Sequence, residues 1–274
     1  MPTITILRFD ELPRLEEATA LLNGKKNGAN WISARRNKYN QDEIFIQYWY
    51  YEGVESGINR AFSEEDGYEI VNVLKENGRD KILKRRYAFI NYVTHSLEVY
   101  GGLDSRTKEL LKLIEKTLKA KFVSLTLTQE ELVELYTKHS AELTKVTFRN
   151  QQRNEEISIT GKNVAASQEF AELFGYPWSL REICFRPKIK FMNEHNKYVV
   201  SLNGDKGTLR VSSNDVFQWR PRFEIRQLIF AIATVIGITD QAKKEAGMKV
   251  SANFEKSEGL PAPHNFGVTP THAY

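Results

Sequence analysis

Alternation of apolar and polar residues predicts β-strands along most of the chain. Strands are expected near residues 3–9, 31–39, 42–53, 68–74, 82–93 and 94–102 in the first half, and near 122–127, 144–150, 155–161, 181–193, 197–203 and 207–213 in the second. Leucines and isoleucines at helical spacing predict helices at 12–22, 105–121, 129–138 and 223–238, with a shorter helical stretch at 165–178. Residues 54–66 fit neither pattern and are expected to form a loop.

Two of these helices have a residue typical of a helix start. Asp10 is the expected N-cap of the helix at 12–22, with Pro13 in its first turn. Thr128 is the expected N-cap of the helix at 129–138, and Glu131 completes a capping-box pattern. A strand followed by a capped helix therefore opens each half of the chain.

The order of strand, helix, hairpin, excursion, hairpin and helix occurs twice. RRNKYNQDEIFI (35–46) is similar to FRNQQRNEEISI (148–159) at an offset of 113 residues, and the hairpin THSLEVYGG has a counterpart in DKGTLRVSS at an offset of 112. We therefore predict an α+β protein, a tandem repeat of two units that are each an antiparallel β-sheet with helices packed on one face. The units are expected at 1–119 and 120–239, followed by a C-terminal arm or disordered tail at 240–274. The alternative is one continuous α+β domain whose hairpins share common turn chemistry.

This element order, over roughly residues 3–237, resembles the tandem repeat of the TATA-binding protein family. In that family a curved sheet binds nucleic acid on its concave face, its helices lie on the convex side, and aromatic wedges lie near its ends. The units here are longer and each has an excursion, and the wedge phenylalanines have no matching positions, so no site residue is carried over. The whole chain also resembles uncharacterised proteins of plasmids and integrated elements of hyperthermophilic archaea, which implies no established activity.

The composition, with 41% hydrophobic and 27% charged residues, describes a soluble globular protein. The stretch MPTITILRF lacks the basic and apolar segments of a signal peptide. The longest apolar run, LIFAIATVIGI, is shorter than the about 20 residues that a membrane-spanning helix needs. The single cysteine, Cys184, fits a reducing compartment and is expected in the core rather than as a nucleophile. We therefore expect a cytoplasmic protein that does not enter a membrane.

Basic residues gather in short clusters that could track a phosphate backbone, and the formal net charge of +4 permits such a partner. In FRPKIKF, alternation is expected to place Arg186, Lys188 and Lys190 in a row on one strand face; a solvated face or a sheet edge protected by Pro187 is the alternative. The other candidate nucleic-acid-binding residues are Arg35, Arg36, Lys84, Arg85, Arg86, Arg149, Arg220 and Arg222. Surface ion pairs with neighbouring acidic residues are the competing interpretation.

Aromatic residues occupy both faces of the strand IQYWYYEG. Tyr48 and Tyr50 are expected on one face and Trp49 with Tyr51 on the other, so the strand fits a stacking platform or a position between helices and a partner. The helix at 223–238 is apolar around nearly its whole circumference. That pattern predicts burial between the units or in a homodimer.

No catalytic or cofactor motif stands out. The five histidines lack metal-ligand spacing, and the chain has no P-loop, G-x-S-x-G or paired-cysteine pattern. We therefore expect a non-catalytic protein without a cofactor that binds nucleic acid with little sequence preference and forms a homo-oligomer or binds a protein partner. A protein-interaction scaffold is the alternative function, and an enzyme with a dispersed site is a third.

Overall fold

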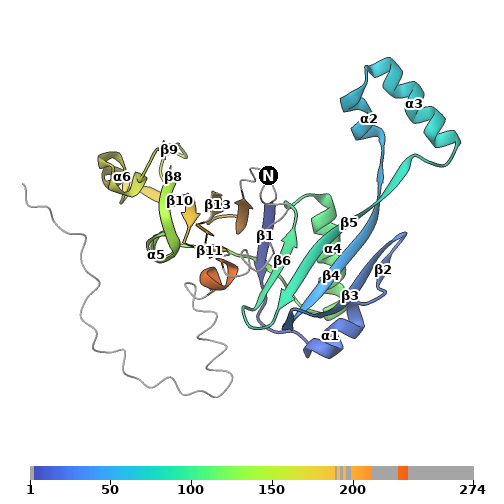
Figure 1. The fold of residues 1–274 in the computed structure, drawn as a ribbon, viewed down its shortest axis with the longest axis horizontal. Coiled ribbons are helices and arrows are strands. Elements are labelled where there is room, and N and C mark those ends of the chain that lie inside the picture. The colour runs from blue at the N-terminus through green and yellow to red at the C-terminus, as the bar shows by residue number, and fades with distance from the viewer. Residues whose placement is uncertain (1–2, 189, 192–193, 196–198, 212–227, 234–274) are drawn as a thin grey trace, which may run out of the picture.

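The computed structural model describes residues 3–188, 190–191, 194–195, 199–211 and 228–233, and it is dominated by one large sheet (Figure 1). The 12-stranded sheet has the order β2-β3-β4-β5-β6-β1-β14-β13-β10-β8-β9, with β7 beside β1. Its strands are β1 (Thr3–Arg8), β2 (Lys26–Asn27), β3 (Asn30–Asn37), β4 (Asn40–Gly53), β5 (Lys81–Asn91), β6 (Ser96–Tyr100), β7 (Val123–Ser124), β8 (Ser140–Asn150), β9 (Glu156–Thr160), β10 (Trp178–Pro187), β13 (Val200–Asn203) and β14 (Thr208–Val211). A second, two-stranded sheet joins β11 (Lys190–Phe191) and β12 (Glu194–His195). The predicted α+β class with an antiparallel sheet is confirmed.

β1 lies in the middle of the large sheet and links the two halves of the chain. It pairs with β6, where Ile4 faces Tyr100, and with β14, where Ile4 faces Leu209. Side chains alternate across a strand, so β1 supplies residues to both faces of the sheet. We call the face that carries Leu7 face A and the face that carries Ile4 and Ile6 face B.

Two hydrophobic cores lie on these opposite faces. On face A, Leu7 packs with the strands of the first half beneath α1 (Leu15–Leu22) and α4 (Ser105–Leu118). On face B, Ile4 and Ile6 pack with the strands of the second half, α5 (Gln129–His139) and the helical residues 228–233. The helices of the two halves therefore cover opposite faces of one sheet. A single concave face with every helix behind it, which the resemblance to the TATA-binding protein implies, is not formed by the described residues.

The helix starts are partly as expected. Thr128 caps α5, and its capping box with Glu131 is formed, as predicted. Asp10 does not cap α1, because α1 begins only at Leu15 and Arg14 occupies the capping position without a side-chain hydrogen bond. The prediction failed because residues 11–14 are irregular. Leu12 lies directly before Pro13, and a residue before a proline disfavours helical geometry.

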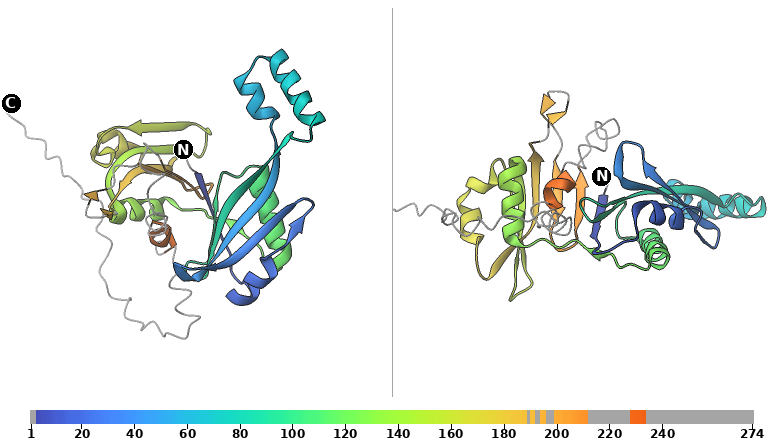
Figure 2. Two further views of the ribbon diagram at one scale, coloured as in Figure 1. Left: turned by 45° about the vertical axis from the view of Figure 1, so that its right-hand side comes forward. Right: turned by 90° about the horizontal axis from the view of Figure 1, so that it is seen from below.

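An arm of two helices, α2 (Glu55–Ala61) and α3 (Glu64–Glu76), projects from the far end of the β4–β5 ribbon (Figures 1 and 2). It corrects two expectations, the loop at 54–66 and the strand at 68–74. Ser63 accepts a hydrogen bond from the Asp66 backbone and starts α3, whose Gly67 and Val71 are buried. No described residue of the arm belongs to either core of the sheet. The pairing of β4 with β5 ends at the base of the arm, where Gly53 lies opposite Lys81.

The two hairpins that share a sequence motif both form, but they join the sheet differently. In the first half, β3 and β4 pair with Arg36 opposite Ile44, and β4 continues the sheet through β5. In the second half, β8 and β9 pair with Arg149 opposite Glu156, and it is the first strand, β8, that pairs with β10. The excursion after β9 contains a 3-10 turn (Val164–Ala166) and α6 (Gln168–Leu173), as its helical pattern indicated. The domain bounds at 119 and 239 remain predictions.

The apolar helix near the C-terminal end is described only over residues 228–233. Ile229 and Ile232 are buried, but in the second-half core, so burial between the units or in a homodimer stays a prediction. The rest of the predicted helix and the segment 240–274 lie outside the described residues. Over the part of the chain that the structure describes, each helix is too short or too polar to cross a membrane.

Candidate nucleic-acid-binding face

Face B of the first half carries a row of aromatic and arginine side chains on strands β3, β4 and β5. The row consists of Trp31, Arg35, Phe45, Trp49, Arg85 and Tyr87, and we call it the aromatic–arginine face. The strand registers put its members on one face, because Trp31 lies opposite Trp49, Arg35 opposite Phe45, and Trp49 opposite Arg85. In the left panel of Figure 2, α1 and α4 lie behind these strands, and α2 and α3 project beyond their end, so these four helices leave this face uncovered.

The rings of this face stack in two nearly parallel pairs. Trp31 and Trp49 have centroids 5.9 Å apart with planes 11° from parallel, and Phe45 and Tyr87 are 5.8 Å apart at 21°. All four side chains are half-buried. Tyr48 and Tyr50, which alternate with Trp49 on β4, are instead buried on face A. The two-sided aromatic strand predicted from IQYWYYEG is thus confirmed, and the described helices that cover it, α1 and α4, lie on one side.

The two arginines of this face lie over its rings. The Arg85 guanidinium is 5.7 Å from the Trp49 centroid and 5.2 Å from that of Tyr87, and the Arg35 guanidinium is 5.3 Å from that of Phe45. Both side chains are exposed, and neither forms an ion pair with a residue that the structure describes. Lys26, opposite Trp31 in the β2–β3 ladder, adds a third exposed cation. Positive charge is therefore held next to planar apolar surface.

The carboxylates of face B in the first half are buried. Glu43, at one end of the row, accepts hydrogen bonds from Asn37 at 2.7 Å and from Asn91 at 2.9 Å. Glu98 of β6 is fully buried. Since both acids are removed from solvent, the exposed charge on the aromatic–arginine face is positive.

Three of the predicted basic residues lie on face A and already have acidic partners. Arg36 forms an ion pair with Glu16 of α1 at 3.3 Å, and Lys84 forms one with Glu52. Their registers place them on the face opposite to Arg35 and Arg85. For these two the competing interpretation, surface ion pairing, is what the structure shows.

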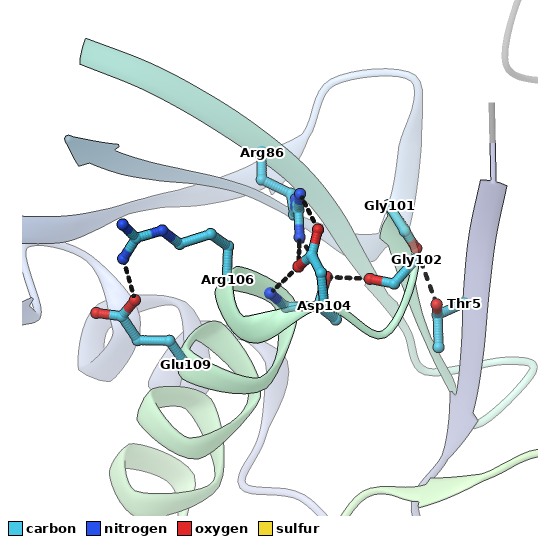
Figure 3. Close-up of polar contacts among 8 residues, drawn as sticks. Thr5, Arg86, Gly101, Gly102, Asp104, Arg106 and Glu109 are labelled. Atoms are coloured by element: carbon cyan, nitrogen blue, oxygen red, sulfur yellow. Dashed lines mark hydrogen bonds and ion pairs between the residues drawn. The ribbon is translucent and has the colours of Figure 1, made fainter. Parts of the chain in front are cut away.

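Arg86, the third, is held at the start of α4 (Figure 3). Its guanidinium donates to both Asp104 carboxylate oxygens, one at 2.8 Å, and to the Thr107 hydroxyl. Asp104 also caps α4 by accepting from the Thr107 backbone N–H at 2.8 Å. Hydrogen bonding from Arg86 lowers the pKa of Asp104 to about 2. Arg86 therefore fixes α4 on the sheet, and the N–H donors that bind Asp104 and Thr107 are not free for a ligand.

The second-half candidates do not form a common surface. Arg149 donates to Asn154 at 3.0 Å, and Arg186 forms an ion pair with Glu142 at 3.0 Å. The expected row of Arg186, Lys188 and Lys190 is interrupted, because β10 ends at Pro187 and the chain passes into the separate strand β11. The Lys188 ammonium reaches the Thr137 carbonyl at 3.4 Å. The side chain of Lys190, together with Arg220 and Arg222, lies outside what is described.

The sequence pointed to Arg35, Arg85 and the ring of Trp49, but not to the other three rings of this face. Trp31, Phe45 and Tyr87 lie in strands that were predicted, yet their clustering depends on the strand registers. One signal was available: in each strand they alternate with residues of the buried set, such as Ile32, Ile44 and Ala88. Large aromatic residues on the side of a predicted strand that faces away from the core are therefore candidates for a binding surface.

The described residues give little support for a metal site, a reactive cysteine or a small-molecule pocket. Among the described residues, no group of three or more His, Cys, Asp or Glu is arranged to hold a metal ion. Cys184 is half-buried rather than in the core, and burial raises the pKa of its thiol, which disfavours the reactive thiolate. A hollow of about 560 Å³ beside α5 contains Arg181, but this guanidinium is paired with Asp205 at 2.8 Å.

The chain matches no protein-family model, and no curated protein was found to be similar to it.

Proposed function

We propose that the protein binds nucleic acid with little sequence preference through the aromatic–arginine face. The observation that carries the proposal is that Arg35 and Arg85 are exposed, lie over aromatic rings and have no ion-pair partner among the described residues. A guanidinium lying over a ring keeps its N–H donors at its edge, where they can bind a phosphate in bidentate fashion.

A purely structural role for the row is the competing explanation. Cross-strand stacking and cation–π contacts stabilise a sheet, and each is worth about 0.5–1.5 kcal/mol. This explains the rings, but it does not explain why neither cation pairs with a carboxylate among the residues that the structure describes. On face A of the same strands, Arg36 and Lys84 have such partners. The contrast between the two faces favours an anionic ligand on face B.

Low sequence preference follows from the kind of contact available. Phosphate contacts position a protein on nucleic acid but carry no sequence information, and stacking accepts any base. The described part of the face offers arginine and aromatic side chains on strands and no helix that could enter a groove.

The test compares two double variants on the same two strands. Arg35→Gln with Arg85→Gln removes both cations of the aromatic–arginine face, whereas Arg36→Gln with Lys84→Gln removes the same charge from the adjacent positions on face A. Affinity for mixed-sequence DNA and RNA oligonucleotides is measured by fluorescence anisotropy at several salt concentrations. The first variant is expected to bind about 10-fold more weakly at low salt and to lower the salt slope by about 1.4, at about 0.7 per lost contact to a single strand. The control is expected to change affinity less than about threefold.

Two outcomes would count against the proposal. Equal losses in both variants would mean that only net charge matters and that the face is not the site. Undetectable binding of the unmodified protein at low salt would remove the function altogether.

A protein-interaction role is the second candidate, and the α2–α3 arm favours it. Residues 54–80 contain seven acidic and three basic residues, and Phe62, Tyr68 and Val73 are 52%, 69% and 56% exposed. Exposed apolar side chains on an acidic projection suit a protein partner, including a second copy of the chain. Sedimentation of the protein with and without the arm tests this role, and an unchanged monomer would oppose self-association through it.

A further inference from the structure

We infer that the aromatic–arginine face takes single-stranded nucleic acid, with bases stacked on its rings. The inference rests on the proposed function and deepens it by naming the form of the ligand. It starts from the neighbourhood of each cation: Arg85 lies over both Trp49 and Tyr87, and Arg35 lies over Phe45. A ligand phosphate bound by either guanidinium would have a half-buried ring beside it.

Only a single strand can use the rings and the cations together. In a duplex the faces of the bases are covered by their neighbours, so a duplex could offer this face only its phosphates. An unpaired strand exposes base faces, and stacking on aromatic side chains adds about 10-fold or more in affinity per base. Arginine next to a base contributes further through cation–π contact.

The position of the face within the sheet also disfavours a duplex. The row occupies β3, β4 and β5, which are flanked by β2 on one side and β6 on the other. Five strands at about 4.8 Å spacing form a surface wider than the about 12 Å of a major groove. The face therefore cannot enter a groove to reach base edges.

The strand geometry sets the length of the site. Arg35 and Arg85 are two strands apart and, through the pairs with Phe45 and Trp49, four residues apart along the strand direction. At about 4.8 Å per strand and about 3.3 Å per residue, their backbones are about 16 Å apart. With phosphates spaced 3.4 Å or more along one strand, this distance covers at most about five nucleotides.

The experiment measures the binding of oligothymidylates of 2 to 12 nucleotides and of a 12-base-pair duplex. Anisotropy gives the affinity, and intrinsic tryptophan fluorescence reports contact with Trp31 and Trp49. We expect the 12-nucleotide strand to bind at least 10-fold more tightly than the duplex, the affinity to rise steeply up to about five nucleotides, and the fluorescence to be quenched.

Ring variants separate stacking from charge. Trp31→Leu and Tyr87→Leu are each expected to weaken single-strand binding about 10-fold without changing the salt slope or the duplex affinity. Tyr176→Leu is the matched control, since Tyr176 is 78% exposed in the second half, away from this face. Thermal melts confirm that each variant is folded.

The outcomes distinguish this inference from the function on which it rests. Equal affinity for strand and duplex, with both weakened by the Arg35→Gln, Arg85→Gln variant, would overturn single-strand selectivity and leave the proposed function standing. Folded ring variants with unchanged single-strand affinity would overturn the stacking. Absence of binding to either ligand at low salt would overturn both proposals.

Discussion

Replacing Asp104 by Asn should destabilise the first half by removing the charge that pairs with Arg86. Asn is itself a good N-cap, so the hydrogen bond from the Thr107 backbone can be kept while the carboxylate is lost. Only 13% of the Arg86 side chain is exposed, so its guanidinium would lose its ion-pair partner in a largely buried position.

The expected loss is about 1 kcal/mol at neutral pH. The pKa of Asp104 lies at about 2 instead of 3.8, mainly through hydrogen bonding from Arg86. For a fully shielded carboxylate this difference would correspond to about 2.5 kcal/mol. Half of the Asp104 side chain is exposed, and screening by water lowers the effect to about 1 kcal/mol.

The pH dependence gives a second check. A carboxyl group whose pKa is lower in the folded state stabilises the protein above its unfolded pKa, and this contribution is lost as pH falls toward the folded value. The gap in the free energy of unfolding between the unmodified protein and Asp104→Asn should therefore be full at pH 7 and narrow from about pH 4 toward pH 2.

Urea unfolding followed by circular dichroism measures both effects. Glu134→Gln is the control, because it breaks the exposed Lys138–Glu134 pair on α5, which is worth about 0.3–0.5 kcal/mol. A loss for Asp104→Asn no larger than that of the control, or a gap that does not narrow on acidification, would refute the assignment of Arg86 to a structural role.

Two further predictions concern a glycine in a tight turn and the α2–α3 arm. Gly207→Ala should cost about 3 kcal/mol or more in urea unfolding, because φ is +56° and an added Cβ would lie 2.4 Å from the Leu125 carbonyl oxygen. Gly24→Ala, at φ +76° with no atom within 4 Å, should cost only about 1–2 kcal/mol, and equal costs would contradict the close approach at Gly207. Replacing residues 54–80 by an Asn-Gly turn should leave the melting temperature within a few degrees, because the arm contributes to neither core; a fall of more than about 10 °C would show that the arm supports the sheet.

Local patterns predicted the strands well where one side of a strand is buried. On β4 the core residues Ile44, Ile46 and Tyr48 alternate with residues of the other face, and this period of two identifies a strand without tertiary information. The helix α3 was missed because YEIVNVL contains β-branched residues that also suit a strand. The better signal was Ser63 followed by three acidic residues, a typical helix start.

The sides on which the helices lie could not be predicted from local pattern. They depend on β1 pairing with both β6 and β14, and the partners Ile4 and Leu209 are about 200 residues apart in sequence. For the site, the positions of Arg35 and Arg85 followed from the basic clusters. Their separation from Arg36 and Lys84 required the strand registers, because neighbouring residues on a strand face opposite sides.

The central place of β1 has a consequence for the time course of folding. A ribosome completes β1 about 200 residues before β14, the neighbour that closes the sheet on its other side. At 5–20 residues per second, the edge of β1 along Thr3–Thr5 would stay bare for about 10–40 seconds of synthesis, whereas β7 can pair with Leu7 and Arg8 earlier. During that interval the backbone N–H and C=O groups along this edge are open to pairing with another chain. The nascent first half should therefore be the stage at which this protein is most exposed to aggregation.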